Sequence, residues 1–288
     1  MSVLLQVSDP HFGTERPEAV RALLELAARQ GPDVVVLSGD ITQRARRRQF
    51  TAARRFVDTI APRVLLAIPG NHDIPLFNVC ARLLWPYGGY RRAFGVDLEP
   101  SHQADDLLVL TVNTTRAYRH KHGEVSEAQV QRVAARLRLA DPAQLRIVVV
   151  HQPVLAARPE DAVNVLRGAR RAVIEWAAAG ADLVLGGHIH LPYVRSLRTV
   201  VPDLSRDLWT AQAGTAVSTR VRDGRPNSVN LVRSLGGRRC DVERWDFAAA
   251  TGRFELHERL EFAFGPGPDD SLTGGAADDS RAGQATQA

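Results

Sequence analysis

The sequence predicts an α/β protein in which two sheets pack together and helices cover the outside. Strand-like apolar runs alternate with helix-like runs through the first two thirds of the 288 residues. After Pro192 this alternation gives way to short strand-like runs joined by glycine-rich turns. Alternating runs of the first kind pack as a sheet flanked by helices. We expect the later strands to form a second, mostly antiparallel sheet on the first.

The expected strands are short and rich in β-branched and aliphatic residues, as buried strands are. In the first two thirds of the chain they cover 3–7, 34–37, 64–68, 146–150 and 182–185. After Pro192 they cover 209–213, 228–232, 240–247 and 253–262. Thr251-Gly252 supplies a hairpin turn between the last two.

The expected helices show apolar residues at helical spacing, and two of them carry terminal signals. Gly31-Pro32 ends the first helix, and Ser126 with Gln129 forms a capping box at the start of the third. The helices are expected at 17–30, 45–60, 126–140 and 170–179. From Gly265 onward the chain consists mainly of small and polar residues, so we expect one domain over 1–264 and a disordered tail over 265–288.

The composition is that of an ordinary globular protein, with 44% hydrophobic residues, 24% charged residues and a formal net charge of +5. Cys80 and Cys240 lie far apart, so neither a disulfide framework nor a thiolate zinc site is indicated. The first apolar run is too short for a signal peptide, and no later run approaches the length of a membrane span. We therefore expect a cytoplasmic protein without a membrane partner. The oligomeric state stays open, a homodimer being one option.

Side chains of the kinds that bind metal ions follow five of the expected strands. They lie in the blocks Asp9-Pro10-His11, Gly39-Asp40, Gly70-Asn71-His72-Asp73, His151 and Gly187-His188-Ile189-His190. Residues just past strand ends gather at one edge of an α/β sheet, so we expect these blocks to meet. Nitrogen and oxygen ligands without sulfur suit zinc, iron or manganese rather than calcium.

The spacing of the blocks favours a pair of ions. Two hydrolytic metal ions lie about 3.5–4 Å apart and share a bridging ligand. Asp40 directly follows a buried strand, and the two oxygens of its carboxylate can each face one ion. Asp9 and His11 are two residues apart along an extended segment, so both side chains can face the same ion.

These five blocks resemble the pattern of the calcineurin-like metallophosphoesterase superfamily: D-x-H, G-D, G-N-H-[DE], H and G-H-x-H. The match runs in family order from Asp9 to His190, with no ligand missing. Within the superfamily the chain resembles bacterial class III cyclic-nucleotide phosphodiesterases, through its size, its block spacing and the segments 113–115 and 122–126. The resemblance implies a four-layer α/β/β/α sandwich of two mixed sheets flanked by helices.

The resemblance also implies two metal ions, iron with manganese or zinc, and a hydroxide between them that attacks phosphorus. The residues implied for the first ion, often iron, are Asp9, His11 and His190. Those implied for the second ion, often manganese or zinc, are Asn71, His151 and His188. Asp40 is implied to bridge the two ions.

On the substrate side, the resemblance implies that Asn71 and His72 contact the phosphate and that His72 can protonate the leaving group. Asp73 has two interpretations: it accepts the second N–H of His72, or it caps a helix that begins near Pro75. His122, or His120 beside it, is a candidate phosphate contact, the alternative being an ordinary exposed loop.

Three further patterns have competing interpretations. The run Arg44 to Arg48 is either an electropositive rim for a phosphate ester or a solvated helix face, and the helix face is favoured because residues 46 to 48 point in different directions. The aromatic run Trp85 to Tyr90 is either a wall for base stacking or local packing, and packing is favoured. Gly39, Gly70, Gly186 and Gly187 are expected where side chains would crowd the ions.

Taken together, the sequence predicts a metal-dependent hydrolase of phosphodiesters, with 3′,5′-cyclic nucleotides as the expected substrates. One alternative is a nuclease or a broad phosphomonoesterase that uses the same binuclear centre. Another is a non-catalytic scaffold with this fold. Scaffolds of that kind typically lose metal ligands, and none is lost here, which disfavours the scaffold.

Overall fold

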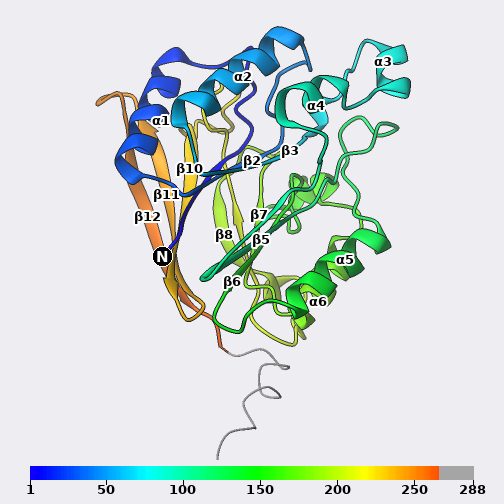
Figure 1. Ribbon diagram of the computed structural model, residues 1–288, viewed down its shortest axis with the longest axis vertical. Helices are drawn as coiled ribbons and strands as arrows, with labels where there is room; N and C mark the ends of the chain where they lie inside the picture. The colour runs from blue at the N-terminus through cyan, green and yellow to red at the C-terminus, as the bar shows by residue number, and fades with distance from the viewer. Residues whose placement is uncertain (266–288) are drawn as a thin grey trace, which may run out of the picture.

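Two six-stranded sheets lie face to face in the computed structural model, which describes residues 1–265 (Figure 1). The strand order is β12-β11-β10-β1-β2-β3 in the first sheet and β4-β5-β6-β7-β9-β8 in the second. Helices α1 and α2 pack on the outer face of the first sheet, and α5 and α6 on that of the second. The expected four-layer α/β/β/α sandwich is confirmed. The tail expected over 265–288 lies, apart from Gly265, outside the described residues.

The first sheet combines strands from both ends of the chain. Its parallel strands are β1 (Val3–Val7), β2 (Val34–Ser38) and β3 (Val64–Ile68). Its antiparallel strands are β10 (Ser228–Gly236), β11 (Arg239–Ala248) and β12 (Arg253–Ala263). Because β10 pairs with β1, the expectation that the strands after Pro192 build a second sheet of their own is wrong. With only β2 beside it, β1 would leave the backbone groups of its other edge unpaired. β10 pairs with that edge.

The second sheet is parallel at its centre and antiparallel at both edges. Its strands are β4 (Ser101–Ala104), β5 (Leu107–Thr111), β6 (Leu145–Val149), β7 (Leu183–Gly186), β8 (Tyr193–Ser196) and β9 (Trp209–Gln212). Both sheets are therefore mixed. The expected run 209–213 belongs here, beside β7, and not with the other late strands.

Four helices match the periodic segments of the sequence: α1 (Pro17–Gln30), α2 (Arg47–Ile60), α5 (Glu127–Arg138) and α6 (Ala169–Ala178). Two short helices follow β3: α3 (Val79–Leu84) begins later than the helix expected near Pro75, and α4 (Gly88–Phe94) was not expected. Short 3-10 helices cover Asn71–Asp73, Pro159–Asn164 and Leu197–Thr199. Within residues 1–265, none of the helices has both the length and the apolar character that a membrane span requires.

The core consists of three apolar layers, one between the sheets and one under each pair of helices. Every residue of β2, β5, β6 and β7 is buried. Strands covered on both faces read as continuous apolar runs, which is why the sequence marks them so clearly. These rigid strands fix the positions of the residues that follow them.

Candidate metal centre

The predicted ligands lie together at one edge of the two sheets, because each follows a strand that runs in the same direction. Asp9 follows β1, Asp40 follows β2 and Asn71 follows β3 in the first sheet. His151 follows β6 and His188 follows β7 in the second sheet. The carboxyl ends of parallel strands are the usual place for a site in such folds.

One group of side chains consists of Asp9, His11 and His190. The His190 Nε2 atom lies 3.3 Å from Asp9 Oδ1 and 3.1 Å from His11 Nε2. All three ligand atoms are within 4.8 Å of one another. Two ring nitrogens and a carboxylate oxygen at this separation form a set that can hold a cation.

A second group consists of Asp40, His151 and His188, also within 4.8 Å of one another. His151 Nε2 lies 3.4 Å from Asp40 Oδ1, whereas His11 Nε2 lies 3.8 Å from Asp40 Oδ2. One oxygen of Asp40 therefore faces each group. This is the arrangement that a bridging carboxylate requires.

Several buried polar atoms of this cluster have no hydrogen-bond partner within the described part of the chain. They are Asp9 Oδ1, His11 Nδ1, Asn71 Oδ1, His151 Nε2 and both ring nitrogens of His188. A buried polar atom without a partner costs about 1–3 kcal/mol, so native proteins usually satisfy it. Metal ions would satisfy Asp9 Oδ1, Asn71 Oδ1, His151 Nε2 and one ring nitrogen of His188, and the residues present therefore fit a metal centre.

The backbone of the cluster is held in an unfavourable conformation. Of the nine non-glycine residues with positive φ in residues 1–265, five belong to the blocks. They are Asp9 (50°), His11 (44°), Asp40 (47°), His188 (75°) and His190 (56°). Each such residue costs about 1–3 kcal/mol, and strain of this kind concentrates at functional sites. The surrounding strands must hold these turns against their local preference.

Hydrogen bonds from neighbouring groups orient the candidate ligands. Ser8 Oγ and the backbone N–H of His188 donate to Asp9 Oδ2, at 2.6 and 2.8 Å. His151 Nδ1 donates to the Ser38 carbonyl at 2.8 Å, and His190 Nδ1 donates to the Arg220 carbonyl at 2.6 Å. These bonds leave the Nε2 atoms of both rings to face the cluster, as is usual for metal-binding histidines.

The electrostatics of the cluster favour the protonation states that bind cations. Burial lowers the pKa values of His11 and His188 to about 3, which keeps both rings neutral. Burial raises the pKa of Asp40, but the imidazoles around it, His151 first, hold that pKa well below its ordinary value. Ionised carboxylates and neutral imidazoles are the forms that coordinate metals. His151 differs: burial lowers its pKa, but Asp40 outweighs this and raises it to about 9.

His72 lies at the edge of the cluster, and each of its ring nitrogens contacts a neighbouring residue. Its Nδ1 atom donates to the Gln43 carbonyl at 2.9 Å, and Arg220 Nη1 lies 3.3 Å from its Nε2. Arg220 thus contacts the ring of His72 through its side chain and that of His190 through its carbonyl. The sequence offered no signal for Arg220, because it lies in no motif and follows the last block by 30 residues.

Asp73 does not have either of its expected roles. Its carboxylate accepts from the backbone N–H groups of Gly70, Ile41 and Thr42, at 2.9, 3.0 and 2.7 Å. The Nδ1 atom of His72 is bonded elsewhere, and α3 begins at Val79 with Asn78 as its cap. Asp73 instead ties the loop after β3 to the loop after β2. This places Asp40 and Asn71 side by side.

Beside the cluster is a cavity of about 300 Å³ with a cationic wall. Its lining residues are Asp40, Arg44, Asn71, His72, His120, Lys121, His188, His190 and Arg220. His120 and Lys121 line this cavity, whereas His122 does not. The contact of His122 with substrate therefore stays a prediction, and the geometry favours its two neighbours.

The glycines in the blocks stand where another backbone or side chain approaches closely. A Cβ on Gly70 would lie 2.0 Å from the Asp40 nitrogen and 2.3 Å from Asp40 Oδ1. On Gly187 it would lie 1.9 Å from Ser8 Oγ, and on Gly39 it would lie 2.3 Å from His151 Nδ1. A methyl group at any of these positions displaces a candidate ligand or its support.

Gly70→Ala is therefore expected to weaken metal binding by about 10–100-fold, the usual effect of disturbing groups that hold a ligand. Gly88→Ala at the start of α4 is the matched control, because its Cβ would meet only Trp85, at an ordinary 3.5 Å. Titration of the metal-free protein with zinc or manganese measures the effect. Equal affinities in the two variants would contradict the role given to Gly70.

Comparison with known proteins agrees with this geometry. The model of the calcineurin-like phosphoesterase family matches residues 2–192. The comparison with curated proteins gives no match.

Solved structures share the fold at low sequence identity. A purple acid phosphatase from yellow lupin (Lupinus luteus) seeds has a TM-score of 0.72 at 12% identity, and the match covers 100% of this chain but 57% of that one. A dimetal phosphatase from Danio rerio has a TM-score of 0.61 at 15% identity, over 92% of this chain and 99% of that one. A Vps29 from Chaetomium thermophilum has a TM-score of 0.52 at 11% identity, over 96% and 100%. The family match covers most of the chain and all five blocks, and the chain belongs to the calcineurin-like phosphoesterase family.

Proposed function

We propose that this protein hydrolyses phosphodiesters at a pair of metal ions. The observation that carries the proposal is the position of Asp40, whose two carboxylate oxygens face two separate groups of ligand atoms. The residues proposed to hold the ions are Asp9, His11, Asp40, Asn71, His151, His188 and His190. The ligand set of nitrogen and oxygen atoms suits iron with manganese or zinc.

When bound, the two ions would lower the pKa of a water molecule and neutralise charge on the phosphate oxygens. The chain itself supplies the remaining parts. Lys121 and Arg220 line the cavity and attract the anionic ester. His72 is proposed, as an imidazolium, to donate the proton on Nε2 to the departing oxygen once Arg220 Nη1 moves off that atom, with its ring fixed by the bond from Nδ1 to the Gln43 carbonyl. A diester has a poor alkoxide leaving group, so this proton is important.

A 3′,5′-cyclic nucleotide is the proposed small substrate. The cavity of about 300 Å³ lies at the lower end of the sizes of small-molecule sites, about 300–1,000 Å³. Its cationic wall suits an ester that carries one negative charge. The cytoplasmic location and a homodimer stay predictions.

A nuclease is the second candidate, because a groove lined by arginines adjoins the cavity of about 300 Å³ beside the proposed ligands. We call this cavity the metal cavity. A non-catalytic scaffold is disfavoured, since all seven proposed ligands are present and gather at one place.

A kinetic panel on the metal-loaded protein tests the proposal. The substrates are 3′,5′-cyclic AMP, bis(p-nitrophenyl) phosphate, p-nitrophenyl phosphate and single-stranded DNA, measured side by side. We expect higher kcat/KM values for the diesters than for the monoester. A clear preference for the monoester would refute phosphodiester specificity. Full metal loading without turnover of any substrate would favour the scaffold.

A further inference from the structure

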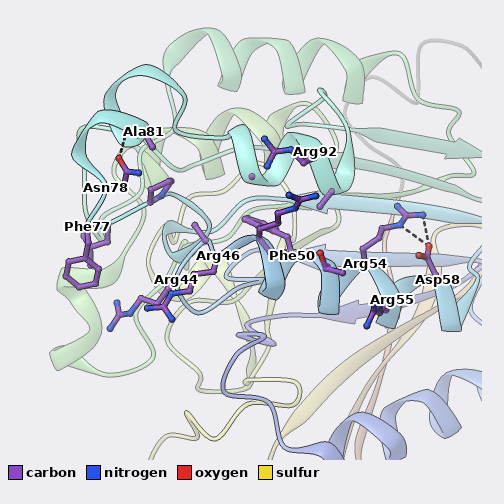
Figure 2. A pocket seen from close by; sticks show the side chains of 17 residues that line it. Arg44, Arg46, Phe50, Arg54, Arg55, Asp58, Phe77, Asn78, Ala81 and Arg92 are labelled. Carbon is purple, nitrogen blue, oxygen red and sulfur yellow. Dashed lines mark hydrogen bonds and ion pairs between the residues drawn. The ribbon is translucent and has the colours of Figure 1, made fainter.

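A second cavity, of about 850 Å³, lies between α2 and the segment that contains α3 and α4 (Figure 2). We call it the arginine groove, because six arginines line it: Arg44, Arg46, Arg47, Arg54, Arg55 and Arg92. The first five come from α2 and the loop before it, and Arg92 comes from α4 on the opposite wall. The expectation of a solvated helix face therefore fits Arg48, which does not line the groove, better than Arg44, Arg46 and Arg47.

The arginine groove is strongly positive and poorly neutralised. Among residues 1–265, Asp58 is the only acidic residue that lines it, which gives this lining a net charge of +5. That value equals the formal net charge of the whole chain, so all other residues together balance to zero. Asp58 pairs with Arg54 at 2.8 Å, and within residues 1–265 no carboxylate pairs with the other five groove arginines. Such a concentration of unpaired guanidinium groups attracts a polyanion.

The arginine groove adjoins the metal cavity at Arg44. Arg44 lines both of them, and a small hollow between them is lined by Arg44, Leu76 and His72. The Arg44 guanidinium stacks on the ring of Phe77, 5.4 Å from its centre. Phe77 is 79% exposed, so the outer part of its ring is open to a ligand. The small hollow is only about 10 Å³, so a strand that extends from the metal cavity to the groove would run over the surface at Arg44.

These features select one kind of occupant. A cyclic nucleotide has a single phosphate, which the metal cavity takes, and it leaves the groove arginines without counter-charges. A lipid surface is flat, whereas five of these arginines line one wall of a concavity and Arg92 lines the other. A single strand of nucleic acid carries regularly spaced phosphates and unstacked bases. Grooves for such strands combine positive charge with exposed aromatic rings, as Phe77 provides here.

We propose that the arginine groove binds the phosphate backbone of single-stranded nucleic acid and leads one of its phosphodiesters to the metal cavity. A base of the strand stacks on Phe77. Cleavage of the strand rests on the proposed function, whereas binding of the strand does not.

The test is binding of a short fluorescein-labelled oligothymidylate with phosphorothioate linkages to the metal-loaded protein, followed by fluorescence anisotropy over a range of salt concentrations. The variant is the pair Arg47→Ala and Arg92→Ala. The matched control is Arg48→Ala and Arg91→Ala, which removes the same charge from neighbouring exposed positions outside the groove. Each lost phosphate contact lowers the slope of log affinity against log salt by about 0.7 for single strands, so the groove pair is expected to lower it by about 1.4. The control pair is expected to leave the slope near that of the unmodified protein.

Phe77→Ala supplies an independent readout, with an expected loss of about tenfold in oligothymidylate affinity from the missing stacking. Equal effects of the two arginine pairs would refute the groove as the binding site. Competition by inorganic tripolyphosphate as strong as that by oligothymidylate, with no effect of Phe77→Ala, would replace nucleic acid by a simple polyphosphate. Binding of phosphatidylglycerol vesicles through the same arginines, without oligothymidylate binding, would also overturn the proposal.

Turnover separates this proposal from the proposed function. Hydrolysis of bis(p-nitrophenyl) phosphate without oligothymidylate binding refutes the groove and leaves the metal chemistry in place. Oligothymidylate binding without hydrolysis of any diester refutes the metal chemistry and leaves the groove in place.

Discussion

Asp40→Ala is expected to abolish both metal binding and diester hydrolysis. Asp40 is buried, and its two oxygens face the two groups of ligand atoms, so its loss removes the shared ligand of both. Metal content per chain and the kcat/KM for bis(p-nitrophenyl) phosphate measure the two effects. Asp105→Ala, in the exposed turn between β4 and β5, is the control and should change neither.

Asp40→Asn refines this experiment. The amide keeps the volume of the side chain and an oxygen that can accept from the His72 backbone N–H, which donates to Asp40 Oδ1 at 2.8 Å. It removes the negative charge and the second coordinating oxygen. We expect the variant to fold and to bind fewer ions than the unmodified protein. Full metal content in either variant would show that Asp40 does not bridge.

His72→Ala is expected to retain both ions and to slow the hydrolysis of alkyl diesters by about 10²–10⁴-fold, the usual contribution of a general acid. The reduction should be smaller for bis(p-nitrophenyl) phosphate, because nitrophenolate leaves without a proton. His102→Ala on the edge strand β4 serves as the control. The measurement is kcat for two diesters, 3′,5′-cyclic AMP and bis(p-nitrophenyl) phosphate, with metal content determined on the same samples.

Loss of metal from His72→Ala would point to a different role. One ring nitrogen of His72 lies within 4.8 Å of ligand atoms of His11 and Asp40, so the side chain is close enough to coordinate an ion. Equal slowing of both diesters with full metal content would instead indicate that His72 positions the phosphate.

The parts of the fold that could be predicted from sequence are those fixed by local pattern. The expected strands at 3–7 and 64–68 and the expected helix at 17–30 match β1, β3 and α1. Buried parallel strands read as apolar runs, and amphipathic helices show their period. The blocks of metal-type ligands follow such strands, and the structure brings all of them together for the same reason.

The parts that could not be predicted depend on pairing between distant segments. Nothing local in the run 228–236 shows that it joins β1 rather than another late strand. Arg220, in the loop before β10, contacts His72 and His190. It does so because that loop packs against the segment after β1, where the Thr219 N–H donates to the Thr14 carbonyl. The arginine groove likewise requires α4 to face α2. With seven residues, α4 is too short for a helical spacing of apolar residues to be recognised in the sequence.

The antiparallel pairing of β1 with β10 also bears on when the candidate metal centre of a newly made chain can be completed. Asp9 leaves the ribosome early, but its carbonyl is bonded to Thr215 Oγ1 at 2.6 Å, and the Ser8 carbonyl accepts from the Ala216 N–H at 2.9 Å. β1, the strand that Asp9 follows, finds its antiparallel neighbour only after β10 has been translated. A nascent chain halted before β10 therefore lacks the antiparallel neighbour of β1, and its site is unfinished.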